Sequence, residues 1–454
     1  MNQRIFLRVF CLTGIMLLTS AVNDLHAADA GIVSGPMPGM SATRQVSVWL
    51  QTNGGKEAAI EYWPVNDKNN VSRSKRFQLS EQAQHTARLE LTDLQPGTRY
   101  QYRVLIDNKR QDTGRPLYFQ TQALWQWREA PPDFKVALGS CAYINESAYD
   151  RPGKPYGAGF EIFDAIAEQQ PDMMLWLGDN IYFRESDFDG PWGMAERYKH
   201  DRALPALQKL LRATHHYATW DDHDFGPNNA NSSFIFKQNA LALFRRYWAN
   251  PSYGLPETPG VFTKVEYNDV DFFLLDGRYY RNGDRAPNTP DKALFGKEQI
   301  AWLKDALLQS KGDTNVSFRI IVGGGQFLND YSPPEGWNHY PDERDAFLKW
   351  LATVKIPGII FLSGDKHRTE LLKYERENAY TLYELTCSPL TAGTYDVSEE
   401  EKKPNVVPGT VLGQRNFCRM DFSGSINKRK LAISVFNSAG ERLWTHALSV
   451  DALK

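Results

Sequence analysis

The sequence predicts a layered α/β domain preceded by a small all-β domain. Between residues 30 and 125, short segments alternate apolar and polar residues and are separated by turn signals, which is typical of a small β-sandwich. From residue 134 onward, short apolar runs typical of buried strands alternate with amphipathic stretches typical of helices. The spacing of apolar residues changes in this way directly after a polar, proline-containing connector. We therefore predict an accessory domain at 30–125 and a second domain at 133–454.

Length and composition indicate a globular protein of ordinary type. The chain has 454 residues, enough for two or three domains, with 42% hydrophobic and 23% charged residues. A formal charge of -2 gives no basic surface for nucleic acid and no polybasic membrane patch. We therefore expect no specific nucleic-acid binding, and we expect a monomer.

A signal peptide is predicted at residues 1–27. Arg4 and Arg8 precede a largely apolar run at 9–22, and residues 25–27 (LHA) resemble a small-residue cleavage site. The apolar run is too short to span a bilayer comfortably, so we expect cleavage and no transmembrane segment in the mature chain. The absence of an adjacent arginine pair favours the general secretory (Sec) route over the twin-arginine route. The expected location is periplasmic or extracellular.

Cysteine usage fits an oxidising compartment. Of the four cysteines, Cys11 falls within the predicted signal peptide, which leaves three. Cys387 and Cys418 both lie in late strand-like segments and are candidates for a disulfide, although the pairing stays open at this level. Cys141 would then be an unpaired thiol.

Turn and strand signals define the all-β block. Strands are predicted at 45–50, 58–62 and 86–91, and residues 94–104 (LQPGTRYQYRV) give a turn followed by a strand. This last run resembles the corner of fibronectin type III-like domains, where a tyrosine hydroxyl ties a loop to the sheet. The block carries no cluster of metal ligands or nucleophile–base pairs. We interpret it as an accessory domain that packs against the second domain and walls its site.

Alternating strand and helix signals define the second domain. Strands are predicted at 134–138, 172–177, 272–275, 319–322, 359–362, 380–385, 417–422, 431–436 and 443–450. Helices are predicted at 160–170, 236–248, 299–308 and 344–354. Residues 393–412 are expected to form a long loop.

Four segments, most of them at predicted strand ends, carry side chains suited to metal binding. They are 136–141 (VALGSC), 177–182 (LGDNIY), 219–229 (TWDDHDFGPNN) and 361–367 (FLSGDKH). Ligands of open α/β sheets bind just outside the carboxyl ends of the strands, so we expect these side chains at a single face of the sheet.

So many anionic groups require a counter-charge, because burying unpaired charge is very costly. Metal cations are the simplest solution, and Asp179 could bridge two ions about 3.5–4 Å apart, as in two-metal phosphoester hydrolysis. The mixed donors suggest two unlike metals. Thiolate with phenolate favours a redox-capable ion such as ferric iron, whereas an oxygen-rich set suits calcium, magnesium or manganese.

The four motifs together resemble those of a known enzyme family. Ser-Cys-Ala, Gly-Asp-Asn-Ile-Tyr, Trp-Asp-Asp-His-Asp with a following Asn-Asn, and Ser-Gly-Asp-Lys-His look like the signature of the PhoD-like metallophosphatases, the alkaline phosphatase D family. The likeness covers roughly 133–454, and the preceding β-sandwich is also similar to that family's N-terminal domain. It implies a metallophosphatase-like layered fold and a secreted phosphodiesterase or phosphomonoesterase, in which a metal-bound hydroxide attacks phosphorus in line.

The resemblance also implies metals and their ligands. The candidate ligands of a ferric ion are Cys141, Asp179 and Tyr182, with His367 or Asp365 completing the sphere. The candidate ligands of one or two calcium ions are the shared Asp179 with Asp222, Asn180 and Asn228. The alternative is a pair of divalent ions such as Mn²⁺, Mg²⁺ or Zn²⁺.

Two further residues are candidates for catalysis. The resemblance makes His223 the candidate for stabilising transition-state charge or protonating the leaving oxygen. Arg278 follows a predicted strand and could pair with the substrate phosphate, because arginine matches phosphate bidentately. A structural salt bridge from Arg278 to Asp276 is the open alternative. Asp224 stands where the family usually has glutamate, and the twin-arginine signal is absent, so the metal identities stay open.

The expected substrate is a small-molecule or polymeric phosphate ester, and we favour diesters over monoesters. One rival is a metal-dependent hydrolase of non-phosphate esters, which only substrate profiling would distinguish from a phosphoesterase. A second rival is a non-catalytic extracellular binding protein on the same fold. The presence of both Asp179 and His223 argues against the second rival.

Overall fold

The computed structural model describes residues 30–332 and 335–454. The predicted signal peptide at residues 1–27 lies outside these ranges. No helix within them is both long enough and apolar enough to cross a membrane.

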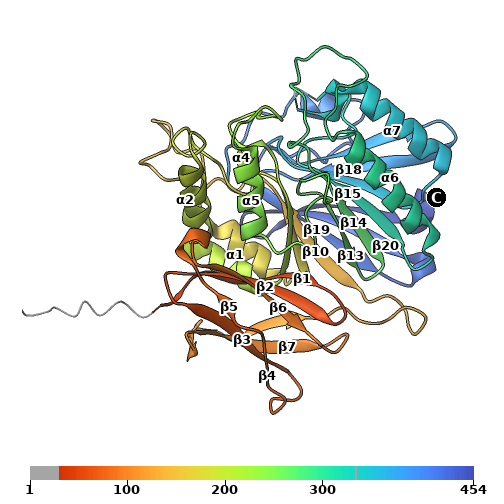
Figure 1. Ribbon diagram of the computed structural model, residues 1–454. Helices are drawn as coiled ribbons and strands as arrows, with labels where there is room; N and C mark the ends of the chain where they lie inside the picture. Colours follow the sequence, from red (N-terminus) through yellow and green to blue (C-terminus); the bar gives the residue numbers. More distant parts are fainter. Residues whose placement is uncertain (1–29, 333–334) are drawn as a thin grey trace, which may run out of the picture.

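The N-terminal block consists of two antiparallel sheets packed face to face, as the alternating pattern predicts (Figure 1). The first sheet contains β1 (Ile32–Ser41), β2 (Gln45–Thr52) and β6 (Thr86–Thr92). The second contains β3 (Glu57–Pro64), β4 (Ser72–Arg73), β5 (Phe77–Gln78), β7 (Arg99–Ile106), β8 (Lys109–Arg110) and β9 (Leu117–Gln120). Alternate residues of the two sheets form one core, and the Tyr100 hydroxyl accepts a hydrogen bond from the Gln95 N–H at 2.8 Å, which ties the preceding turn to the sheet.

The second part of the chain contains two six-stranded sheets that face each other. One sheet has the order β12–β11–β10–β19–β20–β21, and the other has the order β13–β14–β15–β16–β18–β17. The strands of the first are β10 (Phe134–Gly139), β11 (Met173–Leu177), β12 (His215–Thr219), β19 (Asn416–Ser423), β20 (Lys430–Asn437) and β21 (Arg442–Ser449). Those of the second are β13 (Thr263–Tyr267), β14 (Val270–Leu274), β15 (Phe318–Val322), β16 (Ile359–Ser363), β17 (Glu370–Arg376) and β18 (Ala379–Thr386).

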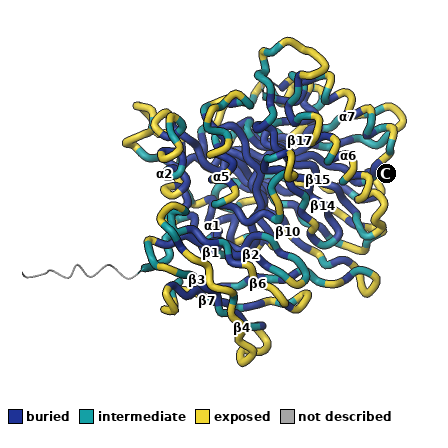
Figure 2. The backbone as a smooth tube through the Cα atoms, in the orientation of Figure 1, coloured by how far each residue is buried: buried dark blue, intermediate teal, exposed yellow. Residues whose placement is uncertain are grey.

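Helices cover the outer faces of both sheets and complete a four-layered arrangement (Figure 1). The first sheet is covered by helices that include α1 (Glu161–Glu168), α2 (Pro191–Arg202), α3 (Gln208–Ala213) and α5 (Lys237–Tyr247). The second is covered by α6 (Lys297–Gly312) and α7 (Pro341–Val354). Because both faces of the central strands are packed, strands such as β11 are buried along their whole length, and the dark blue interior of Figure 2 runs through both sheets. The predicted fold class is confirmed.

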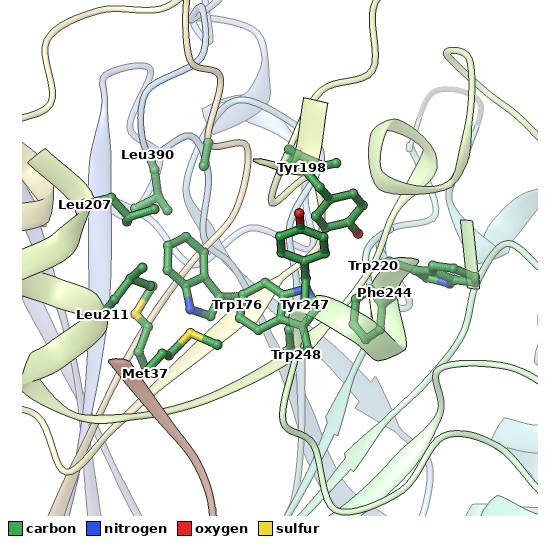
Figure 3. Packing of buried hydrophobic residues seen from close by; sticks show 14 of the residues in the cluster. Met37, Trp176, Tyr198, Leu207, Leu211, Trp220, Phe244, Tyr247, Trp248 and Leu390 are labelled. Carbon is green, nitrogen blue, oxygen red and sulfur yellow. The ribbon is translucent and has the colours of Figure 1, made fainter. Parts of the chain in front are cut away.

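A large aromatic core joins the helical layer to the first sheet and to the N-terminal block. Trp176 of β11 lies beside Trp248, with ring centroids 5.8 Å apart, and Met37 of β1 reaches the same cluster (Figure 3). Trp49 of β2 donates an indole hydrogen bond to the Arg246 carbonyl at 2.9 Å. The N-terminal block is therefore packed onto this layer through buried side chains.

A disulfide joins the two six-stranded sheets. Cys387 follows β18 of one sheet, Cys418 belongs to β19 of the other, and the two form a disulfide within the core between the sheets. The candidate pairing is confirmed, and Cys141 is a free, buried thiol.

Most predicted segments coincide with observed elements, but several observed elements were not predicted, among them β1, β9, β12, β13, β17, α2 and α3. The sequence of β1 and of β12 shows the physical reason for the miss. β1 carries Pro36 and Pro38, which a central strand excludes, and it is tolerated because it lies at the edge of its sheet. β12 begins with His215 and His216, polar residues that are nevertheless buried. Each imidazole has both ring nitrogens in hydrogen bonds, which removes the cost of burying it.

His215 makes the stability of this junction depend on pH. Its Nδ1–H donates to the Gly39 carbonyl at 2.8 Å, and its Nε2 accepts from the Gln120 N–H at 3.1 Å, so the neutral ring is required. Burial lowers the pKa of His215 to about 4, whereas an unfolded histidine titrates near 6.5. The unfolded chain therefore binds more protons between these two values.

We expect the His215 contribution to be fully present above about pH 6.5 and to be lost as the pH falls towards 4, a difference of about 3 kcal/mol. In urea unfolding, the stability difference between the wild type and His215→Gln should shrink over this range. A difference that does not change with pH would contradict the assignment.

Candidate metal centre

The predicted donor segments converge where strands of both six-stranded sheets end. Cys141 follows β10, Asp179 follows β11, Asp222 follows β12, and His367 follows β16. Within each sheet these strands run parallel, so their carboxyl ends meet at one edge. We expected a single face of one sheet, and this expectation was wrong: β16 belongs to the second sheet, and the donors meet at an edge that the two facing sheets share.

The turns after these strands use an unusual backbone conformation. Cys141, Asp179, Asp365 and His367 have φ angles of 60°, 50°, 65° and 51°, in the left-handed region that non-glycine residues rarely adopt. Gly178, with φ of 100°, could not carry a side chain, because a Cβ there would lie 2.8 Å from the Asp221 Cβ. Strained residues of this kind cluster at functional sites.

The first group of donors contains sulfur, oxygen and nitrogen. Ligand atoms of Cys141, Asp179 and His367 lie within 4.8 Å of one another, and all three residues are buried. The Tyr182 hydroxyl lies 3.2 Å from Asp179 Oδ2 and 3.2 Å from His367 Nε2. The Ser388 hydroxyl donates to Cys141 Sγ at 3.1 Å, a contact that fixes the thiol towards this group.

The second group shares Asp179 with the first. Ligand atoms of Asp179, Asp222 and His223 also lie within 4.8 Å of one another. Asp222 Oδ2 accepts from the Asn229 N–H at 2.7 Å, whereas its Oδ1 is buried without a hydrogen bond. Asp179 Oδ1 accepts from the His223 N–H at 3.2 Å. Asp179 thus lies between the two groups, with one oxygen directed to each.

The two predicted asparagine donors differ in exposure. Asn180 is buried, and its amide nitrogen donates to the Thr219 carbonyl at 2.8 Å and to Asp224 at 3.0 Å. These bonds leave its side-chain oxygen buried without a partner, as a ligand would be. Asn228 is exposed and lines the pocket described below.

Electrostatics in this cluster favour a bound cation. Burial, followed by repulsion from Asp222 and Cys141, raises the pKa of Asp179 well above its usual range. Burial raises the pKa of the Cys141 thiol to about 11 and raises that of the Tyr182 phenol. For Asp222 burial opposes ionisation, but the charges of His223 and Arg278 hold its pKa below the usual value.

Metal ions resolve this conflict, because a cation stabilises the ionised form of each acidic group. The buried oxygens of Asp222 and Asn180 that accept no hydrogen bond fit the same interpretation. The residues present therefore fit a metal centre. The first group combines thiol, phenol and imidazole, whereas the second adds oxygen donors, so the two halves suit different metals.

Asp365 and Arg278 lie at the margin of this arrangement. Asp365 lies 2.5 Å from Lys366 Nζ, and His367, rather than Asp365, joins the first donor group. The Arg278 guanidinium is fully buried and contacts Asp221 at 2.5 Å, Glu335 at 3.0 Å and Asp222 at 3.7 Å.

The proposed alternative of a salt bridge from Arg278 to Asp276 was wrong. Asp276 Oδ1 instead accepts from the backbone N–H groups of Arg278 and Tyr279 and from the Trp220 indole.

Several residues of the site escaped the sequence analysis. Ser388 and Glu335 come from loops that carry no periodic signal and reach the site only in three dimensions. Asp224 did carry a detectable signal. With Asp221 it forms a capping box at the start of α4 (Asp222–Phe225), and it also accepts from Asn180. Burial raises the pKa of Asp224 to about 7.

An open pocket of ≈ 580 Å³ adjoins the donor groups. Two of its lining residues connect it to the donor groups: His223 belongs to the second group, and Tyr182 contacts Asp179. Of the described residues, none before Tyr143 lines it. The N-terminal block therefore does not wall this pocket, contrary to our expectation, because it packs against the opposite, amino-terminal end of β12.

Comparisons with known proteins agree with this geometry. A family model described as PhoD-like phosphatase matches residues 136–429, and a domain of unknown function (DUF7800) matches residues 29–116. The chain is 23% identical to alkaline phosphatase D of Bacillus subtilis (strain 168) over 326 residues, which is 62% of this chain. The match spans about half of that relative, 53% of its length.

Two solved structures share the fold. A structure of PhoD superposes with a TM-score of 0.72 at 16% identity, covering 92% of this chain and 88% of that chain. Purple acid phosphatase PPD1 from yellow lupin (Lupinus luteus) seeds gives a TM-score of 0.65 at 11% identity, covering 91% and 74%.

Asp179→Asn should separate the roles of charge and of metal. Because an ionised carboxylate is unfavourable at this buried position, the variant should raise the melting temperature of metal-free protein by a few degrees, on the order of 1 kcal/mol. The same variant should lose most of the stabilisation that added metal ions give the wild type. Differential scanning fluorimetry, first with chelator and then with metal, measures both effects.

The matched control is Asp345→Asn, which removes an exposed carboxylate on α7. This control should change neither the melting temperature of the metal-free protein nor the stabilisation by added metal ions. If Asp179→Asn destabilised the metal-free protein and left the response to metal intact, Asp179 would be a structural carboxylate only.

Proposed function

This chain belongs to the PhoD-like phosphatase family, and on that premise we propose that it is an exported, metal-dependent hydrolase of phosphate esters. The observation that carries the proposal is the pair of donor groups, buried except for the partly exposed His223, that share Asp179 beside an open pocket. We propose phosphodiesters as the preferred substrates, because a pocket of ≈ 580 Å³ has room for an organic group in addition to the phosphate.

The metal-holding residues are proposed from the donor chemistry. The proposed ligands of a ferric ion are Cys141, Asp179, Tyr182 and His367. The proposed ligands of calcium are Asp179, Asp222, Asn180 and Asn228. Bound ions of these kinds act as Lewis acids and lower the pKa of water, which supplies a nucleophile at neutral pH.

His223 is the proposed proton donor to the leaving group. Its side chain lines the pocket and is 22% exposed, and its ring stacks on Tyr182 with centroids 4.2 Å apart. Its Nδ1 is buried without a hydrogen-bond partner, and its Nε2 lies 4.0 Å from Asp222 Oδ2. When water attacks phosphorus, the ester oxygen leaves on the opposite side and takes up a proton, which a positioned imidazole can supply.

Arg278 is proposed as a positioning residue. Its buried guanidinium holds Asp221 and lies near Asp222, so it fixes the orientation of a proposed ligand and offsets the negative charge of the cluster. A direct contact with the substrate phosphate has less support, because the side chain has no exposed surface.

Export is supported by two independent features. The N-terminal segment has the pattern of a Sec signal peptide. The disulfide between Cys387 and Cys418 is of a kind that persists in oxidising compartments. We propose a periplasmic or extracellular location.

The proton-donor role predicts a dependence on the leaving group. We expect His223→Gln to lower kcat for an alkyl phosphodiester by about 100-fold or more. With bis(4-nitrophenyl) phosphate the loss should be less than about tenfold, because 4-nitrophenolate departs without a proton. Steady-state kinetics on both esters test this, and 4-nitrophenyl acetate assayed alongside them distinguishes phosphate-ester hydrolysis from hydrolysis of carboxylic esters.

His446→Gln on β21 is the matched control, since this histidine lies outside the site. An equal loss on both esters for His223→Gln would show that the residue acts through binding or ligand orientation instead.

A further inference from the structure

The pocket beside the metal centre is larger than a phosphate group requires. Its volume of ≈ 580 Å³ is within the range of sites that hold drug-sized molecules. Tyr182 and His223 belong to both the pocket lining and the surroundings of the donor groups. An ester whose phosphorus lies at the donor groups would therefore extend its organic group into this pocket.

Two aromatic rings lie at the exposed surface of the pocket. Tyr395 is 61% exposed and Tyr156 is 36% exposed, and their hydroxyls are 3.2 Å apart. Tyr395 stacks one face on His367, with centroids 5.4 Å apart and an interplanar angle of 16°. Tyr156 packs edge-on against Tyr143 at 5.0 Å. Among the rings that the structure describes, only His367 stacks on Tyr395, and the 61% exposure of Tyr395 leaves ring surface for a ligand.

Four charged groups of the pocket lining are paired with one another, and the exposed Lys154 is a further charged residue of the lining. Arg184 contacts Asp150 at 2.9 Å and lies over the Tyr143 ring at 4.0 Å. Arg151 contacts Glu185 at 2.6 Å. With these four charges paired, the rings and Lys154 are the surface that remains for contacts with a substrate, and the rings are the part suited to an uncharged organic group.

Tyr395 is held in place although it lies on a loop. The segment before it is hydrogen-bonded to the backbone beside Cys141: Leu390 N–H donates to the Ser140 carbonyl at 2.8 Å, and Ala392 N–H donates to the Cys141 carbonyl at 3.1 Å. The Thr391 hydroxyl donates to the Tyr143 carbonyl at 2.7 Å. The loop that carries the ring is thus tied to the segment that carries a proposed metal ligand.

We propose that this pocket binds the organic group of the phosphate ester and selects planar aromatic rings, namely nucleobases or aryl groups, over aliphatic polyols. The inference rests on the proposed function and specifies its substrate class. Stacking of a planar ring on an aromatic side chain contributes about 1–3 kcal/mol per base, which is roughly 5- to 150-fold in kcat/KM.

The test compares diesters of similar intrinsic reactivity. A deoxyadenosine dinucleoside monophosphate and glycerophosphoglycerol both release an alkoxide, but only the first carries planar rings. We expect Tyr395→Ala to lower kcat/KM for the dinucleotide by about 5- to 150-fold, mainly through KM, and to change it for the glycerol diester by less than about twofold. Tyr395→Phe, which keeps the ring, should retain most of the preference for the dinucleotide over the glycerol diester.

A third substrate and a control variant sharpen the result. Diphenyl phosphate distinguishes an aryl group from a nucleobase as the preferred ring. If Tyr395→Ala lowers kcat/KM for diphenyl phosphate but not for the dinucleotide, the pocket selects aryl groups. The reverse result would identify a pocket for nucleobases. Tyr149→Ala removes a ring that is 51% exposed and lines a different pocket, so it should leave kcat/KM for all three diesters unchanged.

Two outcomes would overturn the inference. One is an equal loss for all three diesters with Tyr395→Ala, which would mean that the ring acts only by supporting His367. The other is no loss for either ring-bearing ester. If the wild type hydrolysed no phosphate ester, the proposed function would fail. The ring preference of the pocket could still be tested by calorimetric titration with deoxyadenosine monophosphate and with glycerol 3-phosphate. Only the former should bind in a way that Tyr395→Ala weakens.

Discussion

A buried carboxylate shared by two groups of donors is the constraint around which this molecule is arranged. Asp179 directs one oxygen towards Tyr182 and Cys141 and the other towards the His223 backbone, close to Asp222. Burial and neighbouring negative groups make its ionised form unfavourable unless a cation is present. The proposed chemistry requires that this carboxylate be fixed in position, and the surrounding fold supplies the rigidity.

The rigidity comes from strands and turns rather than from the donor residues themselves. β11 is buried along its length, so the turn at Gly178 begins from a fixed point. The same is true of β16, which brings His367 in from the second sheet. The disulfide between Cys387 and Cys418 joins the two sheets, so donors contributed by both keep their relative positions. Residues held in the left-handed conformation, such as Cys141 and Asp179, are tolerated only because this frame determines the path of the chain.

Sequence reasoning recovered the features that depend on local pattern. Cys141, Asp179 and His367 each follow a short buried strand, and that rule alone predicted that they would lie together. It could not predict that two sheets share the edge, because the order of strands depends on long-range pairing. Tyr395 and Glu335 were missed since they come from irregular loops. The partners of Arg278 were missed for a related reason: Asp221 and Glu335 are each 57 residues away in the chain. The roles of these residues in binding metal and in catalysis stay predictions.

Elemental analysis of the protein as isolated, combined with its visible absorption spectrum, tests the central claim most directly. The account predicts at least two metal ions per chain, including iron, and a phenolate-to-iron charge-transfer band that disappears in Tyr182→Phe. It also predicts that Asp179→Asn lowers the content of both metals, because both groups of donors share that carboxylate. A colourless protein that contains only divalent metal and is fully active would contradict the ferric site, and loss of a single metal from Asp179→Asn would contradict the shared carboxylate.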